Sequence, residues 1–362
     1  LEVPFQDRPP GAKDKAIVGM VELPSSKFIS LAETATWNFQ QAAMMHWLPS
    51  APDSEIIFND RQGDRLISVI LNVHTRERRV LPRPISAMSH DGKTALSLNF
   101  ARLQWTRPGY GYAGINDPFA SECHPVEDGI YLIDLESGED WRIVSLADVF
   151  AIRDKPKEMK NHAIYFNHTL YNTDDSRFAF HVEWRNLLFP RWARVWRLKK
   201  LYRLKTALFT ANVDGSDLRC VIDYGRVSHF DWRNPREILV WANMKGHGKK
   251  FYLIIEGKDE FRTVGEGVLT RDGHCSFSPN GRWILTDTYP DKKGYRTLKI
   301  FHWEEGWEVV LGRYYSPHPY VDEIRCDLHP RWNRKGTQIC FDSVHNGSRQ
   351  LYVMDISKLI RE

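Results

Sequence analysis

The chain has 362 residues, 42% hydrophobic and 12% aromatic, enough to bury one large core or two moderate ones. Its formal net charge of +4 is too small to identify a partner by itself, and no apolar run is long enough to predict a membrane span. Five cysteines at irregular spacing argue against a disulfide framework.

The start of the chain bears on its location. The sequence begins at Leu1 and carries no apolar signal segment, so we interpret it as a mature or trimmed chain, which leaves room for a targeting peptide that was removed. We expect a periplasmic or secreted protein, with the cytoplasm as the alternative.

The first predicted element is a hairpin over residues 16–31, "AIVGMVELPSSKFISL". After it, a unit recurs: a short polar and aromatic strand, a turn, and then alternating strands that end in Asp or Gly. Six units can be counted, beginning at Trp37, Ile85, Asn167, Ser228, His274 and His329. Their third strands include "DGIYLIDLESGE", "ALFTANVDGSD", "KKFYLIIEGKDE", "RTLKIFHWEEG" and "RQLYVMDIS".

Alternating strands at this spacing, with almost no helical periodicity, are typical of β-propeller blades. We therefore predict a single all-β domain over residues 1–362, a β-propeller of seven blades. The amino-terminal hairpin has no inner strands, and we expect it to complete a blade begun by the carboxyl terminus.

The inner strands of a propeller line its channel, so the residues that begin each unit should meet there and form a binding site. These positions are unusually polar: Asn38, Gln40, Gln41, His168, His229, His274, Asp327 and His329. Each histidine, taken alone, could instead be a hydrogen-bonding residue between blades. Four histidines from four blades favour a functional site.

The last two units predict a metal site. Asp327 and His329 are two residues apart on an extended strand, so their side chains point the same way, and His274 has the equivalent place in the preceding unit. Two imidazoles and a carboxylate suit a divalent metal, for which we consider Mn²⁺, Zn²⁺ and Ca²⁺, and we expect no organic cofactor. Strand alternation should turn Cys275 and Cys326 away into the core.

These motifs resemble those of the β-propeller polysaccharide lyases, particularly the oligogalacturonate lyases and, more loosely, the propeller ulvan lyases. The oligogalacturonate lyases hold a metal with a His that opens an inner strand before an Asp-Gly turn, and with a later Gln and His-x-His-Pro cluster. Here His274 precedes the Asn280-Gly281 turn, and His329-Pro330 matches the final His-Pro. The stretch "SHFDWRNP" is similar to a "GHPIYRP"-type strand whose His lies in the substrate cleft, which places His229 there.

The sequence departs from this pattern at two ligand positions. Asp327 stands where the His-x-His-Pro cluster has its first His. Ile324 or Arg325 stands where the family has the Gln. The resemblance implies a carbon–oxygen lyase that cleaves an anionic, uronic-acid-containing polysaccharide or oligosaccharide, of ulvan or pectin type, by β-elimination.

β-Elimination needs a group that neutralises the uronate carboxylate, a base for the C5 proton and an acid for the leaving oxygen. Our acid and base candidates are His168, His181 and His229, with Tyr202 and Arg203 as further catalytic candidates. The predicted substrate-binding residues are Asn38, Gln40, Gln41, Arg102, Arg185, Trp232 and Arg233. For His181 and Arg185, an exposed strand end with no such role is the alternative.

Two insertions interrupt the blades. Residues 185–205, "RNLLFPRWARVWRLKKLYRLK", hold eight Lys or Arg, interleaved with aromatics and without an acid. We interpret this basic insertion as a lid over a polyanionic glycan. A nucleic acid or a membrane surface could also be its partner. The alternative without a binding role is a helical excursion that packs its Trp and Leu residues against the propeller. Residues 99–119 are rich in Gly and Tyr and predict a rim loop over the channel.

Other chemistries lack their motifs: the sequence has no phosphate-binding glycine loop, no dinucleotide fingerprint, no GxSxG elbow and no CxxC pair. Glycoside hydrolysis by a pair of carboxylates is compatible with a chain that contains 46 Asp and Glu residues. However, the residues that begin the inner strands are His, Asn and Gln more often than Glu. The second hypothesis is a non-catalytic propeller that binds an anionic glycan or a protein. We expect no nucleic acid partner.

Overall fold

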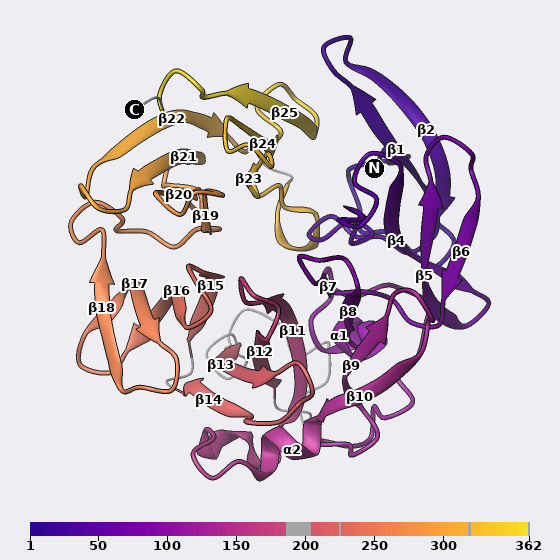
Figure 1. Ribbon diagram of the computed structural model, residues 1–362, viewed down its shortest axis with the longest axis vertical. Helices are drawn as coiled ribbons and strands as arrows, with labels where there is room; N and C mark the ends of the chain where they lie inside the picture. Colours follow the sequence, from indigo (N-terminus) through magenta and orange to yellow (C-terminus); the bar gives the residue numbers. More distant parts are fainter. Residues whose placement is uncertain (186–203, 224–225, 318–319, 361–362) are drawn as a thin grey trace. The chain divides into compact units, whose positions relative to one another are not determined.

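The computed structural model describes residues 1–185, 204–223, 226–317 and 320–360. Its strands form one two-stranded sheet and six larger antiparallel sheets. Each larger sheet is a meander whose neighbouring strands follow one another along the chain, as in propeller blades (Figure 1). The chain divides into two compact units, Leu1–Asp223 and Tyr224–Glu362, and each is described by itself.

The first unit contains the amino-terminal hairpin and three blades. The hairpin is β1 (Ala16–Glu22) with β2 (Lys27–Thr34). The first blade is β3 (His46–Trp47), β4 (Glu55–Gln62), β5 (Arg65–Asn72) and β6 (Arg78–Leu81). The second is β7 (Ala87–Met88), β8 (Thr94–Ser97), β9 (Gly129–Asp134) and β10 (Asp140–Ser145), and the third is β11 (Ala163–Tyr171), β12 (Arg177–Arg185), β13 (Lys205–Asn212) and β14 (Arg219–Ile222).

Short helices accompany these blades: α1 (Phe100–Thr106), α2 (Leu146–Ala151) and the 3₁₀ helix η1 (Lys157–Asn161). Helix α2 begins with a capping box, in which Ser145 Oγ accepts from the backbone N–H of Asp148 and the Asp148 carboxylate accepts from the N–H of Ser145.

The second unit contains the other three blades. They are β15 (Val227–Trp232), β16 (Glu237–Met244), β17 (Gly248–Ile255) and β18 (Glu260–Val264); β19 (Ser276–Phe277), β20 (Trp283–Thr286), β21 (Tyr295–His302) and β22 (Glu308–Tyr315); and β23 (Arg331–Trp332), β24 (Gln338–Ser343) and β25 (Gln350–Asp355). A 3₁₀ turn, η3 (Asp322–Ile324), precedes the last blade.

The β-propeller prediction is confirmed, but the count of seven blades is wrong, because the described residues form six. The hairpin β1–β2 is a sheet of its own, and the last blade, β23–β25, has three strands. The hairpin is attached to the first blade, since Thr34 Oγ1 donates to the carbonyl of Asn59 at 2.9 Å. The recurring units therefore counted the blades correctly, and the hairpin added none.

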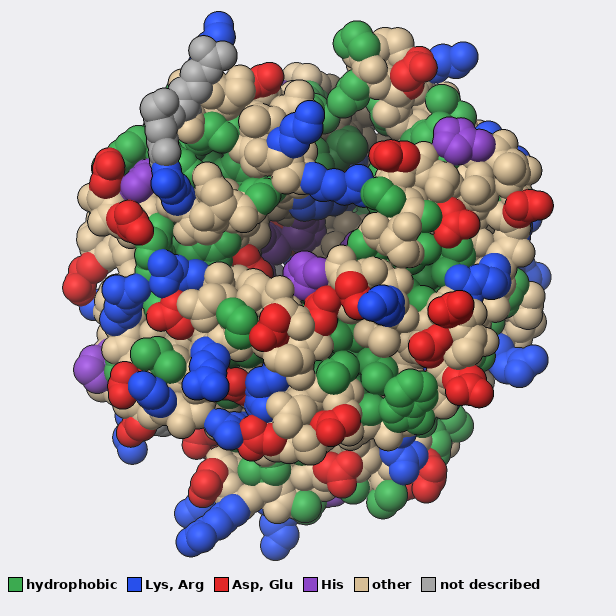
Figure 2. All heavy atoms as spheres, in the orientation of Figure 1, with side chains coloured by type: hydrophobic (Ala, Val, Ile, Leu, Met, Phe, Trp, Pro, Cys, Tyr) green, Lys and Arg blue, Asp and Glu red, His purple; other side chains and the backbone are tan. Residues whose placement is uncertain are grey.

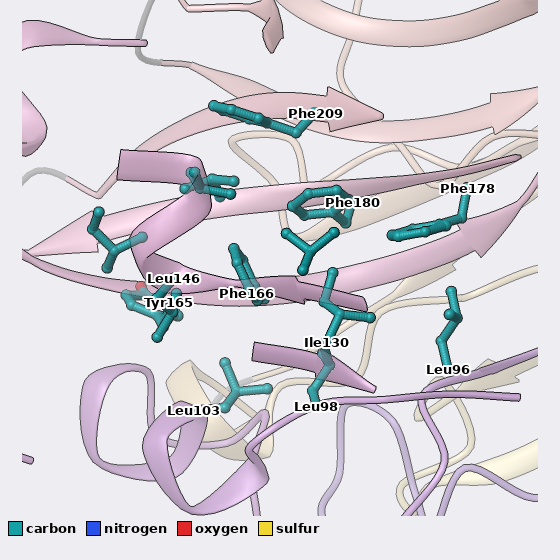
Figure 3. Packing of buried hydrophobic residues seen from close by; sticks show 14 of the residues in the cluster. Leu96, Leu98, Leu103, Ile130, Leu146, Tyr165, Phe166, Phe178, Phe180 and Phe209 are labelled. Carbon is teal, nitrogen blue, oxygen red and sulfur yellow. The ribbon is translucent and has the colours of Figure 1, made fainter. Parts of the chain in front are cut away.

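Apolar residues of alternate strand positions pack between neighbouring sheets of the first unit. Figure 3 shows Leu96 and Leu98 of the second blade facing the same cluster as Phe166, Phe178 and Phe180 of the third. All five cysteines are free thiols, and Cys275 and Cys326 are buried as predicted. The described residues thus hold their blades together by apolar packing without a disulfide.

Figure 2 shows basic and acidic side chains interspersed over the face that it draws, in keeping with a small net charge. None of the described helices combines the length and the apolar character that crossing a bilayer requires.

The rim insertion, residues 99–119, starts with helix α1 rather than with a loop alone. Arg102 of this helix is 1% exposed. Its guanidinium donates to Asp117 at 3.0 Å and to the backbone carbonyls of Ile164, Phe119, Glu122 and Cys123 at 2.7 to 3.2 Å. The prediction of Arg102 as a substrate-binding residue is therefore corrected: a buried guanidinium that anchors the insertion does not reach a substrate.

This anchoring role predicts a loss of stability. Arg102→Met would leave Asp117 buried with its charge uncompensated, which should lower the free energy of unfolding by about 3–5 kcal/mol. Denaturant unfolding checks this, with Arg313→Met as the control because Arg313 pairs with Asp291 at the surface. Equal stability of the two variants would contradict the role of Arg102.

Asp128 adds a pH dependence to the same region. Burial raises its pKa to about 6, while the bond from Asn99 Nδ2 at 2.8 Å opposes the rise. A raised carboxyl pKa contributes stability that is fully present below about pH 4 and is lost as the pH rises through about 6. Asp128→Asn should therefore flatten the fall in unfolding free energy over this window, measured by denaturant titration at several pH values.

Candidate functional site

The second unit brings together the ends of its three innermost strands. His229 lies on β15, His274 just before β19 and His329 just before β23. The ring centroids of His229 and His274 are 4.0 Å apart, and those of His274 and His329 are 4.2 Å apart. We call these three residues the histidine cluster. The sequence prediction that the inner strands present their histidines to one place is thus met within this unit.

Backbone irregularities aim two of these side chains. The pairing of β15 with β16 shifts register between Val227 and Phe230, so His229 lies in a β-bulge. His329 has φ +40°, a left-handed conformation that a non-glycine residue rarely adopts. Bulges and such conformations re-aim side chains and are found often at functional sites.

Two carboxylates, the buried Asp287 and the partly exposed Asp272, fix two of the imidazoles. Asp287 accepts at 2.9 Å from Nδ1 of His274 and at 2.7 Å from its backbone N–H. Asp272 lies 2.9 Å from Nδ1 of His229. A hydrogen bond to Nδ1 sets the tautomer and leaves Nε2 to act on a ligand or a substrate.

The charge states in the cluster differ from one imidazole to the next. Burial lowers the pKa of His229, and the neighbouring His274 lowers it further. Burial and His274 also hold the pKa of His329 well below its usual value. The pKa of His274 is raised: burial opposes the rise, but the attraction of Asp287 outweighs it. His229 and His329 are therefore neutral near pH 7 and offer lone pairs.

His274, Asp327 and His329 form the predicted metal triad. One ligand atom of each residue lies within 4.8 Å of the others. Asp327 is buried between two guanidinium groups: Arg296 Nη1 is 2.7 Å from Oδ1, and Arg325 Nε donates to Oδ2 at 2.7 Å. Although burial opposes ionisation, Arg325 and its other cationic neighbours depress the pKa of Asp327, so the carboxylate is ionised.

The donor set fits a divalent cation. The Asp287 contact leaves Nε2 of His274 available, and each carboxylate oxygen of Asp327 has a lone pair beyond the one that faces an arginine. Two nitrogen donors favour Mn²⁺ or Zn²⁺ over Ca²⁺, which prefers oxygen ligands.

A second polar group lies in the first unit, around the third blade. His168 has φ +50° in a β-bulge of β11, and its ring centroid is 5.4 Å from that of His181 and 5.6 Å from that of Tyr110. Gln41 Nε2 is 3.5 Å from His168 Nδ1. The structure thus brings together three of the predicted residues, His168, His181 and Gln41.

A buried carboxylate lies behind this group. Glu183 is fully buried, pairs with Arg107 and accepts from Asn167 Nδ2 at 3.2 Å. His181 is itself 3% exposed, so the alternative of an exposed strand end is wrong for its side chain.

Other predicted residues have structural contacts. Asn38 is buried, where its side-chain oxygen accepts from the backbone N–H groups of Gln40 and Gln41. Gln40 is buried at 7% exposure beside it. Arg185 ends β12 at an intermediate position, which leaves its substrate role a prediction.

Trp232 and Arg233, both predicted to bind the substrate, make contacts within the protein. Trp232 is 3% exposed and therefore has no face for a sugar ring, which corrects its substrate-binding prediction. Arg233 pairs with Glu237 at 2.7 Å and lies over the ring of Trp303. Tyr202, Arg203 and most of the basic insertion lie outside the described residues.

Sequence reasoning missed four partners that complete the cluster, Asp272, Asp287, Arg296 and Tyr289, and considered Arg325 only as one of two residues at the position of the Gln ligand. Only Asp287 had a signal, as the Asp that ends the alternating strand in "WILTD". The other partners belong to no motif and follow no spacing, so only the fold shows that they lie beside the histidines.

No family model matches the chain, and no curated protein matches it in sequence. Solved structures match it in three dimensions. An oligogalacturonate lyase from Vibrio parahaemolyticus aligns over 95% of this chain and 84% of its own, with a TM-score of 0.63 and 14% identity. The fold is similar to that of the oligogalacturonate lyases.

A second oligogalacturonate lyase, solved in complex with manganese, covers 97% of this chain and 98% of its own, with a TM-score of 0.55 and 11% identity. Prolyl endopeptidases match 92% of this chain and 42% of theirs, with a TM-score of 0.52 and 10% identity. The likeness to oligogalacturonate lyases agrees with the sequence resemblance, and at these identities the comparisons show the fold alone.

Proposed function

We propose that the protein is a polysaccharide lyase that cleaves a uronic-acid-containing anionic glycan by β-elimination. The observation that carries the proposal is the histidine cluster, in which carboxylates fix two imidazoles beside a triad suited to a metal. A module that only binds a glycan does not need this set of titratable groups. The fold similarity to oligogalacturonate lyases supports the proposal and suggests a pectin-type substrate.

His274, Asp327 and His329 would hold a divalent cation of the Mn²⁺ type. When bound, such a cation supplies positive charge that neutralises the uronate carboxylate and so acidifies the C5 proton. Arg325 adds a partly exposed guanidinium to the same place, with 21% of its side chain accessible. Its charge favours an anionic group beside Asp327.

His229 would act as the base. Its imidazole is neutral, its Nδ1 is held by Asp272, and its Nε2 can accept the C5 proton. The electron pair of the C5–H bond forms the C4–C5 double bond, and the C4–O bond to the neighbouring sugar breaks.

The test is the ultraviolet absorbance of the unsaturated uronate during incubation with ulvan, pectic fragments and glucuronan. We expect a rise on at least one glycan, and its suppression by EDTA with recovery on added Mn²⁺. A rise that ignores EDTA would remove the cation from the proposal and keep the histidine chemistry. The absence of a rise on every glycan would contradict the lyase and favour a non-catalytic glycan-binding propeller.

Metal binding itself can be measured apart from turnover. Calorimetric titration of the metal-free protein with Mn²⁺ should give binding that His274→Ala and His329→Ala each abolish, because each removes one of the donors. His302→Ala is the matched control, since His302 belongs to the same blade as His274 but stacks on Trp307. Unchanged Mn²⁺ affinity in both triad variants would refute the metal assignment.

A further inference from the structure

The proposed elimination still lacks a group that protonates the leaving oxygen, and Tyr289 lies beside the proposed base. It is partly buried in the loop that follows β20. Its ring centroid is 5.9 Å from that of His229 and 6.2 Å from that of His274. It is thus near both the proposed base and a proposed metal ligand.

The backbone holds this tyrosine in place. The N–H of Tyr289 donates to the carbonyl of Asp272 at 3.4 Å, and Asp272 is the carboxylate that contacts His229. Gly273 permits this approach, because a Cβ there would lie 1.8 Å from the carbonyl oxygen of Asp287. The segments 272–274 and 287–289 therefore cross in close contact, and this crossing positions His274, the Asp272 carboxylate beside His229, and Tyr289 together.

We propose that Tyr289 is the proton donor to the leaving glycosidic oxygen, an inference that rests on the proposed lyase function. A phenol is a suitable general acid, because it holds its proton at neutral pH and can deliver it to an oxygen that develops negative charge. Neither Asp272 nor Asp287 suits this task, since each contacts an imidazole through its carboxylate.

The proposed step conserves atoms and charge. His229 takes the C5 proton, the C5–H electron pair becomes the C4–C5 double bond, and the C4–O bonding pair leaves with the oxygen. The Tyr289 O–H gives its proton to that oxygen, which departs as a free hydroxyl. The imidazolium then releases a proton to solvent and the phenolate takes one up, so no net proton is consumed.

A stacking role is the alternative for this residue, because aromatic rings also pack against sugar faces. The two roles differ in which substitution matters. Tyr289→Phe keeps the ring and removes only the proton, whereas Tyr289→Leu removes both. A proton donor is lost in both variants, but a stacking ring is retained in Tyr289→Phe.

The experiment compares wild type, Tyr289→Phe and Tyr289→Leu on the glycan that the wild type cleaves, with Tyr295→Phe as the control. Tyr295 is in the same blade and packs on Tyr315, so its hydroxyl should not affect turnover. We expect Tyr289→Phe to lower kcat by about 10²-fold or more with KM little changed. In D₂O the variant should still exchange the C5 proton, seen as deuterium in recovered substrate.

The outcomes separate the two proposals. A wild-type enzyme that cleaves no glycan overturns the lyase and the role of Tyr289 with it. Wild-type turnover together with a fully active Tyr289→Phe variant overturns the proton donor alone. A raised KM in Tyr289→Leu only, with kcat of Tyr289→Phe intact, assigns the ring to stacking. Thermal unfolding of each variant excludes loss of fold as the cause.

Discussion

His229→Ala should abolish lyase turnover while leaving the protein folded. Its imidazole is the proposed base, and loss of a general base costs about 10²–10⁴-fold in kcat. Its side chain is 17% exposed and belongs to a bulge rather than to the apolar core, so the unfolding temperature should change little. Initial rates from the ultraviolet absorbance of the product, together with thermal unfolding, measure both effects.

His247→Ala is the control for that substitution. His247 is exposed in the turn between β16 and β17. Among the described aromatic residues, its ring packs edge-on against Phe261 alone. It should retain full activity. If His229→Ala kept wild-type kcat, the base would have to be sought among His168 and His181 of the first unit, for which the acid–base role is still a prediction.

Gly273→Ala should disable the site through the backbone. Its methyl group would lie 1.8 Å from the Asp287 carbonyl oxygen and 2.9 Å from Oδ1 of the same residue, so the two segments must separate. Separation breaks the bonds from His274 to Asp287, which fix the orientation of that imidazole. We expect a stability loss of about 1–3 kcal/mol and, because small misplacements of catalytic groups are costly, about a 10²-fold lower kcat.

Gly246→Ala distinguishes this effect from a general intolerance of glycine replacement. Gly246 has φ +79°, and an alanine methyl group there would meet no atom within 4 Å, so alanine costs only the backbone strain, about 1 kcal/mol. Its kcat should be that of the wild type. A Gly273→Ala variant that behaves like Gly246→Ala, with stability reduced and kcat preserved, would show that the crossing does not set the geometry of the site.

The sequence predicts the blades well because each blade is a local structure. Strand alternation, turn residues and the order of the strands are all contained within one recurring unit, and all six predicted units became sheets. The hairpin misled the count for the opposite reason. Its two strands alternate like blade strands, but only the fold shows that Thr34 attaches them to the first blade.

The site is less local, and the sequence predicts it only in part. Spacing on one strand relates Asp327 to His329, and the recurring unit relates both to His274. Nothing in the spacing relates Arg296 to Asp327, although they form an ion pair between β21 and the segment before β23. The predictions of Arg102 and Trp232 as substrate-binding residues failed because both side chains are buried. Nothing in the sequence distinguishes a buried Arg or Trp from one that binds a ligand.

The left-handed backbone at His329 sets function against folding. A residue with a Cβ costs roughly 1–2 kcal/mol in this conformation, and glycine would adopt it freely. We infer that the chain gives up stability at this position to present the proposed ligand imidazole, and a screen for thermostable variants should reverse this trade-off. His329→Gly is the substitution that such a screen should recover, with a higher unfolding temperature and without the imidazole of the proposed metal triad.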